Sequence, residues 1–271
     1  MDTHRLFNIT ASLLLLLSFL GMLFMIREVI VRIEDYPDDL SQLEWSVERK
    51  TPVNKKETTD YGSAMGLDVS HYQGKIDWNN MDERIAFVIC KATEGLSFTD
   101  PEFDYNWAQI KASGRVRGAY HFYVASDDPI GQARYFWAAV KTYDDTDLPL
   151  VLDIEPEGVK EHITPAKLHT DVLNFLEELT SLSGKKPIIY VDYSFANEYL
   201  NNQKFTEYPL WIAEYESESA PKLPDTWQHI GWDFWQRSPS YEEKGISGDV
   251  DYDLFDGNVR ALKEFARNKN F

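Results

Sequence analysis

Two acidic residues, Asp153 and Glu155, end an apolar run that begins at Leu148. Side chains in a strand alternate between its faces, so these two carboxyl groups should point the same way. A charged group at the end of an apolar run is costly to bury, so its presence there suggests a chemical role. Cleavage of a glycosidic bond needs two such groups, because one donates a proton and the other supports positive charge at the sugar carbon. The spacing therefore predicts a glycoside hydrolase.

Composition limits the other classes of function. The chain has 271 residues and is 43% hydrophobic, which is enough for one sizeable domain and an appendage. The formal net charge of -18 argues against a nucleic-acid partner, because phosphate groups would be repelled. The single cysteine, Cys90, excludes an intramolecular disulfide, and the histidines lack the spacing of a metal site. We therefore expect no metal and no cofactor.

The N-terminal region contains an uncharged segment at residues 9–26, which is apolar apart from Thr10, Ser12, Ser18 and Gly21. At helical rise this segment nearly spans the hydrocarbon core of a bilayer, and no small-x-small cleavage site follows it. We therefore expect residues 1–26 to form a cytoplasmic tip and a single-pass transmembrane anchor, with the lipid bilayer as a partner. Basic residues on both sides of the segment, Arg5 before it and Arg27 and Arg32 after it, leave the orientation open.

Two further regions follow the apolar segment. Residues 27–63 are polar, charge-rich and without sustained periodicity, which predicts a linker or stalk. From residue 64 to 271, short apolar runs alternate with helical patterns. We expect strands at Met65–Val69, Ala86–Lys91, Gly118–Tyr123, Leu148–Ile154, Pro187–Val191, Leu210–Ala213, Asp233–Gln236 and near Val250, and helices at Pro101–Ser113, Pro129–Tyr143, Pro165–Leu182, Phe195–Asn201 and Gly257–Asn268.

This alternation predicts an α/β fold, a (β/α) barrel of the TIM type whose later units are irregular. In such barrels the chemistry lies at the carboxyl ends of the strands. Asp68 ends the first expected strand, Glu94 follows the second, and Asp251 lies beside the last. Acidic groups thus gather at one end of several strands, which a purely structural pattern would not produce.

Seven segments, in this order, resemble glycoside hydrolase family 25, the Chalaropsis-type lysozymes that cut peptidoglycan. Asp-x-Glu alone occurs by chance in many proteins, whereas seven segments in order at barrel spacing form a specific signal. The resemblance covers the expected barrel and leaves out the apolar segment and the stalk. The segments are Gly66–Gly74, Lys91–Gly95, Tyr120–Tyr123, Leu152–Glu155, Leu210–Tyr215, Phe234–Gln236 and Val250–Asp251.

The resemblance implies an N-acetylmuramidase that cleaves the β-1,4 bond between N-acetylmuramic acid and N-acetylglucosamine, with its catalytic domain outside the cytoplasm. Glu155 would be the general acid, and Asp153 would remain ionised and stabilise positive charge or orient the acetamido group of the substrate. Asp68 and Asp251 would be the other two site acids. Candidate substrate-binding residues are Glu94, Tyr120, Tyr190, Trp211, Tyr215, Trp235 and Gln236.

Several alternatives stay open. The domain could be a non-catalytic peptidoglycan-binding module, or a chitinase-like glycosidase on a similar barrel. Asp249 to Asp253 resembles part of a calcium loop but lacks the glycine and the distal glutamate of an EF-hand. Trp211 and Trp235 could each line the groove or lie in the core. We favour a retaining route in which the acetamido group of the substrate is the nucleophile and Asp153 assists it.

Overall fold

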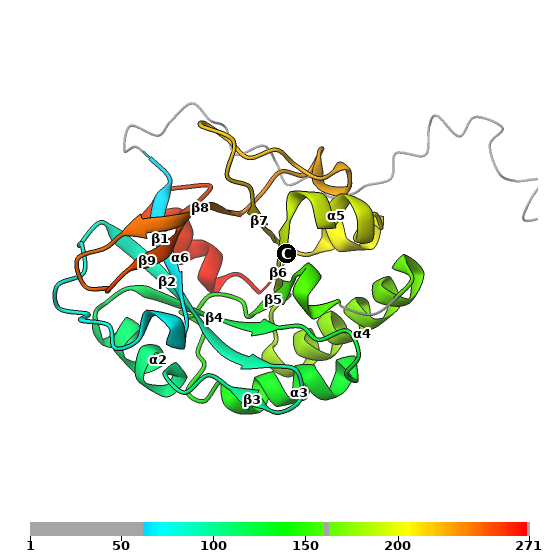
Figure 1. The fold of residues 1–271 in the computed structure, drawn as a ribbon, viewed down its shortest axis with the longest axis horizontal. Coiled ribbons are helices and arrows are strands. Elements are labelled where there is room, and N and C mark those ends of the chain that lie inside the picture. The colour runs from blue at the N-terminus through cyan, green and yellow to red at the C-terminus, as the bar shows by residue number, and fades with distance from the viewer. Residues whose placement is uncertain (1–61, 160–162, 270–271) are drawn as a thin grey trace, which may run out of the picture. The chain divides into compact units, whose positions relative to one another are not determined.

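Eight strands close into a barrel in the computed structural model, which describes residues 62–159 and 163–269. Their order around the barrel is β1-β9-β8-β7-β6-β5-β4-β2, and pairing of β1 with β2 closes the ring. The predicted α/β barrel is therefore confirmed (Figure 1). The strands are β1 (Ala64–Val69), β2 (Ile85–Glu94), β4 (Val116–Phe122), β5 (Val151–Ile154), β6 (Ile188–Asp192), β7 (Leu210–Ala213), β8 (Phe234–Glu242) and β9 (Asp249–Phe255).

The barrel departs from a regular (β/α) repeat at its end. Neighbouring strands from β1 through β8 run parallel, whereas β9 runs antiparallel to both β8 and β1. A two-residue strand, β3 (Phe98–Thr99), pairs with the end of β2 as a short hairpin. The helices are α2 (Phe103–Ala112), α3 (Pro129–Ala139), α4 (Pro165–Ser183), α5 (Tyr193–Tyr199) and α6 (Val259–Arg267), and α3 lies beside α4 (Figure 1).

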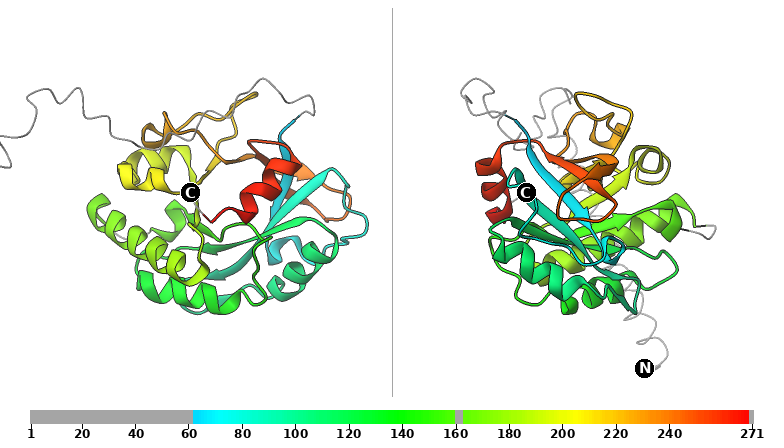
Figure 2. Two further views of the ribbon diagram at one scale, coloured as in Figure 1. Left: turned by 180° about the vertical axis from the view of Figure 1, so that it is seen from behind. Right: turned by 60° about the vertical axis from the view of Figure 1, so that its left-hand side comes forward.

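Strand alternation divides the core into two layers. On β2, Phe87 and Ile89 belong to the cluster inside the barrel, whereas Val88 and Cys90 belong to the layer between strands and helices. α6 packs Leu262 against the inner cluster and so closes one end of the barrel; Figure 2 shows α6 from behind. With that end closed, a ligand is expected to enter from the opposite end, where the parallel strands have their carboxyl termini.

The expected strand ends differ most at β8. We expected this strand to stop at Gln236, but it continues to Glu242 as a hairpin with β9. The extension is polar and contains Pro239, features that argue against a central strand. It pairs because the register shifts between Gln236 and Ser238, and again before Tyr241, which lets an irregular ladder form beyond the barrel wall.

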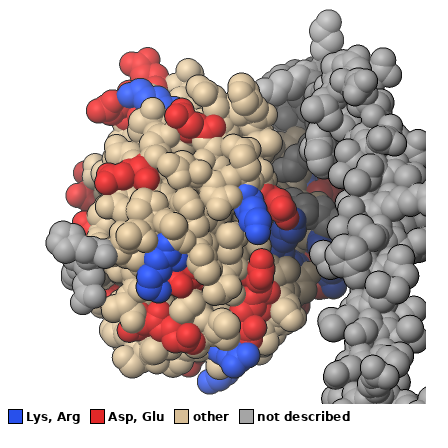
Figure 3. Space-filling view, turned by 90° about the vertical axis from the view of Figure 1, so that its right-hand side faces the viewer, with Lys and Arg blue, Asp and Glu red and all other residues tan. Residues whose placement is uncertain are grey.

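Within residues 62–159 and 163–269, no helix is both long enough and apolar enough to span a bilayer. The predicted anchor at residues 9–26 lies outside the described residues, as does all but the end of the predicted stalk. Acidic side chains are interspersed with basic ones on the face drawn in Figure 3. The strong acidity of the chain is therefore not gathered into one patch on that face.

Candidate active site

β5 and the turn after it position Asp153 and Glu155. β5 pairs with β4 and β6, and Asp153 lies in register with Tyr190. Glu155 follows the strand with an extended backbone (φ -128°, ψ 158°), so the alternation of β5 continues and brings its side chain to the side of Asp153. Pro156 then begins a short 3-10 helix, η3 (Pro156–Gly158), which ends the extended segment. Both carboxyl groups line the same cavity.

Close contact between two loops holds this turn in place. The Tyr123 N–H donates to the carbonyl oxygen of Asp153 at 2.9 Å, and the Ala125 N–H donates to that of Gly158 at 2.9 Å. A Cβ atom at Gly158 would lie 2.0 Å from the carbonyl oxygen of Tyr123. Only glycine permits this approach, so Gly158 keeps the loop that carries Glu155 against the end of β4.

A cavity of about 200 Å³ lies at the carboxyl end of the barrel. Its lining residues come from seven strands or from the loops that directly follow them, so the barrel itself sets their positions. All of them were predicted as site residues from the sequence. They are Asp68, Tyr120, Asp153, Glu155, Tyr190, Trp211, Tyr215, Gln236 and Asp251.

A side-chain amide links several of these groups. Gln236 Nε2 donates to Asp68 Oδ2 at 2.7 Å. Gln236 Oε1 accepts hydrogen bonds from the Tyr190 hydroxyl at 2.9 Å and from the Tyr215 hydroxyl at 2.5 Å. Because these partners occupy both ends of the amide, its orientation is fixed. The network therefore holds Asp68 at the cavity wall and leaves the two tyrosine rings to shape the adjacent wall.

Asp253 is a buried acid that the sequence analysis did not select. It lies two residues after Asp251 on β9, is fully buried, and accepts a hydrogen bond from Trp211 Nε1 at 2.9 Å. Its charge raises the pKa of Asp68. Strand alternation from Asp251 was the signal that could have found it, because a residue two positions along points to the same side. Asp253 therefore supports the cavity from beneath.

We expect Asp253→Asn to stabilise the protein at neutral pH more than at acidic pH. Burial, followed by the charge of Asp251, raises the pKa of Asp253 well above its ordinary value. The folded state thus holds a proton that the unfolded state releases above about pH 4, and stability falls as pH rises through the folded pKa. Asparagine keeps an oxygen for Trp211 but cannot ionise.

Thermal unfolding of Asp253→Asn and the wild type at pH 4 and pH 7 checks this expectation. The variant should gain about 2–4 °C over the wild type at pH 7, as about 1 kcal/mol gives in a domain of this size, and much less at pH 4. An equal change in melting temperature at both pH values would show that ionisation of Asp253 does not matter.

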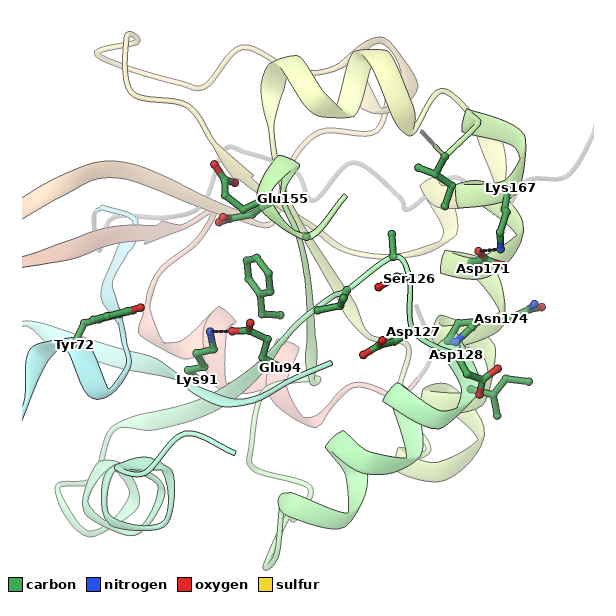
Figure 4. Close-up of a pocket in the computed structure, with 18 residues that line it drawn as sticks. Tyr72, Lys91, Glu94, Ser126, Asp127, Asp128, Glu155, Lys167, Asp171 and Asn174 are labelled. Atoms are coloured by element: carbon green, nitrogen blue, oxygen red, sulfur yellow. Dashed lines mark hydrogen bonds and ion pairs between the residues drawn. The ribbon is translucent and has the colours of Figure 1, made fainter. Parts of the chain in front are cut away.

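A second, larger cavity of about 1200 Å³ adjoins the first, and Glu155 lines both. Figure 4 shows Tyr72 at one end of it and Lys167, Asp171 and Asn174 at the other, with Lys91, Glu94 and Glu155 between them. The predicted residue Glu94 lies here rather than in the smaller cavity. Glu155 is therefore placed where a long groove meets a small, deep pocket of acids.

Lys91 brings a positive charge to this acidic site. Its Nζ lies 2.7 Å from Glu94 Oε2 and 4.9 Å from the centre of the Phe122 ring. Its charge lowers the pKa values of both Asp153 and Glu155, opposing the effect of burial. The sequence analysis did not select Lys91, although a lysine within the apolar run of β2 was a usable signal.

Burial raises the pKa values of all four predicted catalytic acids. The pKa of Glu155 rises to about 7, through burial and then the charge of Glu157, and that of Asp251 rises to about 6 through burial. The pKa values of Asp68 and Asp153 rise well above the ordinary range, also chiefly through burial. Burial opposes ionisation of Asp153, and its role as the ionised partner stays a prediction. The charge of Glu155 raises the pKa of Asp153 further.

Trp235 requires a correction. We expected it to contact substrate, but it lines neither cavity and is buried in the layer between strands and helices. Its Nε1 donates to the carbonyl oxygen of Glu214 at 2.6 Å, and its ring packs against Trp232. The next residue, Gln236, points into the barrel, so alternation along β8 turns Trp235 outward. Trp211, by contrast, does line the small cavity.

Clustered carboxyl groups, as in this site, are common ligands of metal ions. In the part of the chain that the structure describes, no three His, Cys, Asp or Glu side chains are placed to hold a metal ion together.

The family model named glycosyl hydrolases family 25 matches residues 67–246, which is more than half of the chain. This chain belongs to glycosyl hydrolases family 25. The predicted family and the predicted class of enzyme, a glycoside hydrolase, are thus confirmed. The matched region contains three of the four predicted catalytic acids, and Asp251 follows it on β9.

Relatives of this family 25 enzyme include bacterial proteins and a solved lysozyme. This chain is 36% identical over 206 residues to the uncharacterized protein YegX of Escherichia coli K12, and the match covers 74% of this chain and 72% of YegX. This chain is 32% identical over 222 residues to Lysozyme M1 of Streptomyces globisporus, and the match covers 77% of this chain and 73% of Lysozyme M1. The crystal structure of the bacterial lysozyme from Streptomyces coelicolor superposes with a TM-score of 0.71 at 30% identity, covering 78% of this chain and 100% of that chain.

Proposed function

We propose that this family 25 enzyme hydrolyses the β-1,4 bond between N-acetylmuramic acid and N-acetylglucosamine in peptidoglycan. The observation that carries the proposal is the placing of Asp153 and Glu155 on one cavity wall, with Glu155 also facing the long groove. A glycan strand in the groove would bring one glycosidic oxygen to Glu155, while the sugar on one side of that bond enters the small cavity. The names of two relatives, Lysozyme M1 and N,O-diacetylmuramidase, support the choice of substrate.

Substrate binding would decide which carboxyl group holds the proton. Asp153 Oδ1 is buried and has no hydrogen-bond partner among the described residues. The acetamido N–H of the muramic acid residue is a donor of suitable chemistry for this oxygen. A hydrogen bond to the charged form of a carboxyl group lowers its pKa, so Asp153 would ionise and leave the remaining proton on Glu155. The bound substrate would thus prepare its own general acid.

The chemical step then uses both residues. Glu155 donates its proton to the glycosidic oxygen as the bond from that oxygen to the sugar carbon breaks. The acetamido oxygen attacks the same carbon, and Asp153 stabilises the positive charge on the resulting ring. Water afterwards attacks the sugar carbon, breaks its bond to the acetamido oxygen and gives its proton to Glu155, which restores the acid. Attack from one face and then the other retains the anomeric configuration.

Asp68 and Asp251 would act through position and charge. They face each other across the β1–β9 pair, and Gln236 holds Asp68 in place. Their oxygens can accept hydrogen bonds from sugar hydroxyl groups, and their negative charge favours a positively charged transition state. Tyr120, Tyr190, Trp211 and Tyr215 supply ring surface around the same sugar.

We expect the value of kcat/KM to fall as pH rises through about 7. The general acid must be protonated, and burial raises the pKa of Glu155 to about 7. Each further pH unit should cost about tenfold in rate, because the protonated fraction falls tenfold. Initial rates on purified peptidoglycan between pH 4 and pH 9 measure this fall, which is the alkaline limb of the pH profile. A rate that stays level up to pH 9 would contradict the assignment of Glu155.

A neighbouring charge offers an independent check on that limb. Glu157 raises the pKa of Glu155 and is itself exposed. Glu157→Gln should therefore move the alkaline limb to lower pH, by roughly less than one unit because solvent screens exposed charges. A shift in the opposite direction would show that the limb belongs to another group.

The products separate this function from its alternatives. Peptidoglycan and chitin are digested side by side, and the new reducing ends are identified by mass spectrometry. Reducing ends at muramic acid support the proposal, reducing ends at glucosamine support a chitinase-like glycosidase, and binding without new ends supports a non-catalytic module. The anomeric form of the first product, measured by NMR, tests the retaining route.

We also propose that residues 9–26 anchor the enzyme in a membrane as a single-pass helix, that residues 27–63 form a stalk, and that the catalytic domain lies outside the cytoplasm. The apolar, uncharged sequence of residues 9–26 supports this, and a cell-wall substrate requires a barrel on the outer side. Membrane fractionation of cells that express the full chain, with protease added from outside, tests both parts. An intact chain in the soluble fraction would contradict the anchor.

A further inference from the structure

Tyr72 is the most exposed of the large hydrophobic residues in the described part of the chain, at 81%. Scattered exposed hydrophobic residues are ordinary in proteins, so exposure alone carries no argument. Tyr72, however, lines the same cavity as Glu155. Two other exposed hydrophobic residues, Leu96 and Phe98, lie in the hairpin between β2 and β3. Exposed apolar surface is therefore present at the carboxyl end of the barrel, where the groove opens.

The backbone around Tyr72 is held firmly although its ring is exposed. The Ser70 N–H donates to Gln73 Oε1 at 2.9 Å, and the Tyr72 N–H donates to Ser70 Oγ at 3.2 Å, which closes a capping box around the short helix η2 (His71–Gln73). The His71 N–H donates to the buried Asp100 at 2.9 Å. An exposed ring on a fixed backbone loses little conformational freedom when it binds a ligand.

One face of the Tyr72 ring already has a neighbour. The His71 ring lies 4.2 Å from it, centre to centre, in a tilted contact, and 5.8 Å from the Phe98 ring. Asp100 Oδ2 lies 2.7 Å from His71 Nδ1, which fixes the orientation of the imidazole. The Tyr72 ring is therefore supported by a fixed neighbour, while its large exposure leaves ring surface open to a ligand.

The two ends of the groove differ in chemistry. Figure 4 shows Tyr72 alone at one end, whereas Asp128, Lys167, Asp171 and Asn174 lie at the other. A volume of about 1200 Å³ exceeds the ~300–1,000 Å³ of ordinary small-molecule pockets and suits a chain-like ligand. Sugar rings have apolar C–H faces that can cover an aromatic ring, while their hydroxyl groups stay in water at the edges. The aromatic end thus fits a sugar ring.

We propose that Tyr72, supported by His71 and Phe98, is a stacking platform for a sugar ring of the glycan strand, at a distance from the bond that is cleaved. The inference rests on the proposed function and adds a binding site to it. Tyr72 contributes to binding of the polymer and takes no part in proton transfer, since Glu155 lies further along the same groove.

Binding of the full chain to insoluble peptidoglycan tests the platform apart from catalysis. Glu155→Gln is combined with Tyr72→Ala, and the bound fraction is measured by sedimentation. The tyrosine variant should need about 3- to 10-fold more peptidoglycan for half-saturation, the range expected for loss of an aromatic pair. Tyr72→Phe and Tyr72→Trp should bind like the parent. Ile230→Ala removes an exposed hydrophobic side chain that lines neither cavity and should change nothing.

The same substitutions in the active enzyme give a second readout, which is the kinetics of peptidoglycan hydrolysis. Tyr72→Ala should raise KM on polymeric peptidoglycan by a similar factor and leave kcat unchanged, with no effect on the shortest glycan fragment that is cleaved. An unchanged KM on the polymer, an equal loss on the short fragment, or failure of Tyr72→Phe to bind would overturn the platform. Absence of hydrolysis by the wild type would instead contradict the proposed function, and the sedimentation result would still decide the platform.

Discussion

Replacing Glu155 with glutamine is expected to lower kcat on peptidoglycan by about 10²–10⁴-fold, the usual contribution of a general acid. Glutamine has nearly the same shape but no proton that it can give to the glycosidic oxygen. The desolvated surroundings of Glu155 stay in place, so binding of the glycan should change little. Release of reducing ends from purified peptidoglycan measures the effect, with KM determined in the same series.

A matched substitution separates chemistry from folding. Glu264→Gln removes a carboxyl group from the exposed face of α6, at the closed end of the barrel, where it pairs with Arg260. An exposed pair of this kind contributes little to stability, so activity should stay at the wild-type level. If Glu155→Gln retained activity while both variants had wild-type melting temperatures, Glu155 would not be the acid.

Asp153→Asn is expected to lower kcat by about 10²–10³-fold, the range typical for loss of one group that stabilises transition-state charge. Asparagine cannot become negative when positive charge develops at the sugar carbon. Its amide can also present N–H groups to the acetamido N–H of the substrate, where the wild type presents only acceptors. The buried Asp153 Oδ1, which has no partner among the described residues, makes the site sensitive to this change.

The comparison for Asp153 is Asp225→Asn. Asp225 is exposed in the short helix η5 (Asp225–Trp227) and lines neither cavity. Its substitution should leave both kcat and KM unchanged. Equal losses in the two variants would point to a general effect of removing acid from this protein, and an active Asp153→Asn enzyme would refute a role for the second carboxyl group.

Strand positions were predictable from the sequence because each apolar run is short and lies next to clear helix signals. Thr164 and Pro165 begin α4, and Gly184 ends it in a left-handed conformation (φ 74°), as such residues do. The antiparallel direction of β9 was not predictable, because hydrophobic alternation has the same period in either direction. The hairpin extension of β8 was missed because its residues are polar and depend on register shifts in the pairing with β9.

Asp68, Asp153 and Glu155 could be located because each lies at or near the end of an apolar strand, where a charged residue stands out in the sequence. The choice of Asp251 depended on the family resemblance. Trp235 was misplaced since its sequence neighbours alone do not tell which face of β8 looks inward. Lys91 was not selected because its importance depends on its charge near Asp153 and Glu155, which belong to another strand and its loop. Asp253 was not preferred over Asp251 because its contact with Trp211 on β7 forms only in the folded barrel. Charge balance at a site is a property of the assembled barrel and cannot be read from one strand.

The pairing of β1 with β9 has a consequence for when the enzyme becomes active. Asp68 is contributed by the first barrel strand and Asp251 by the last, and they meet only across that pair. A ribosome must therefore release almost the entire polypeptide before the acid pocket exists. A nascent chain, or one shortened before Asp251, is therefore expected to lack the acid pocket that we propose for catalysis.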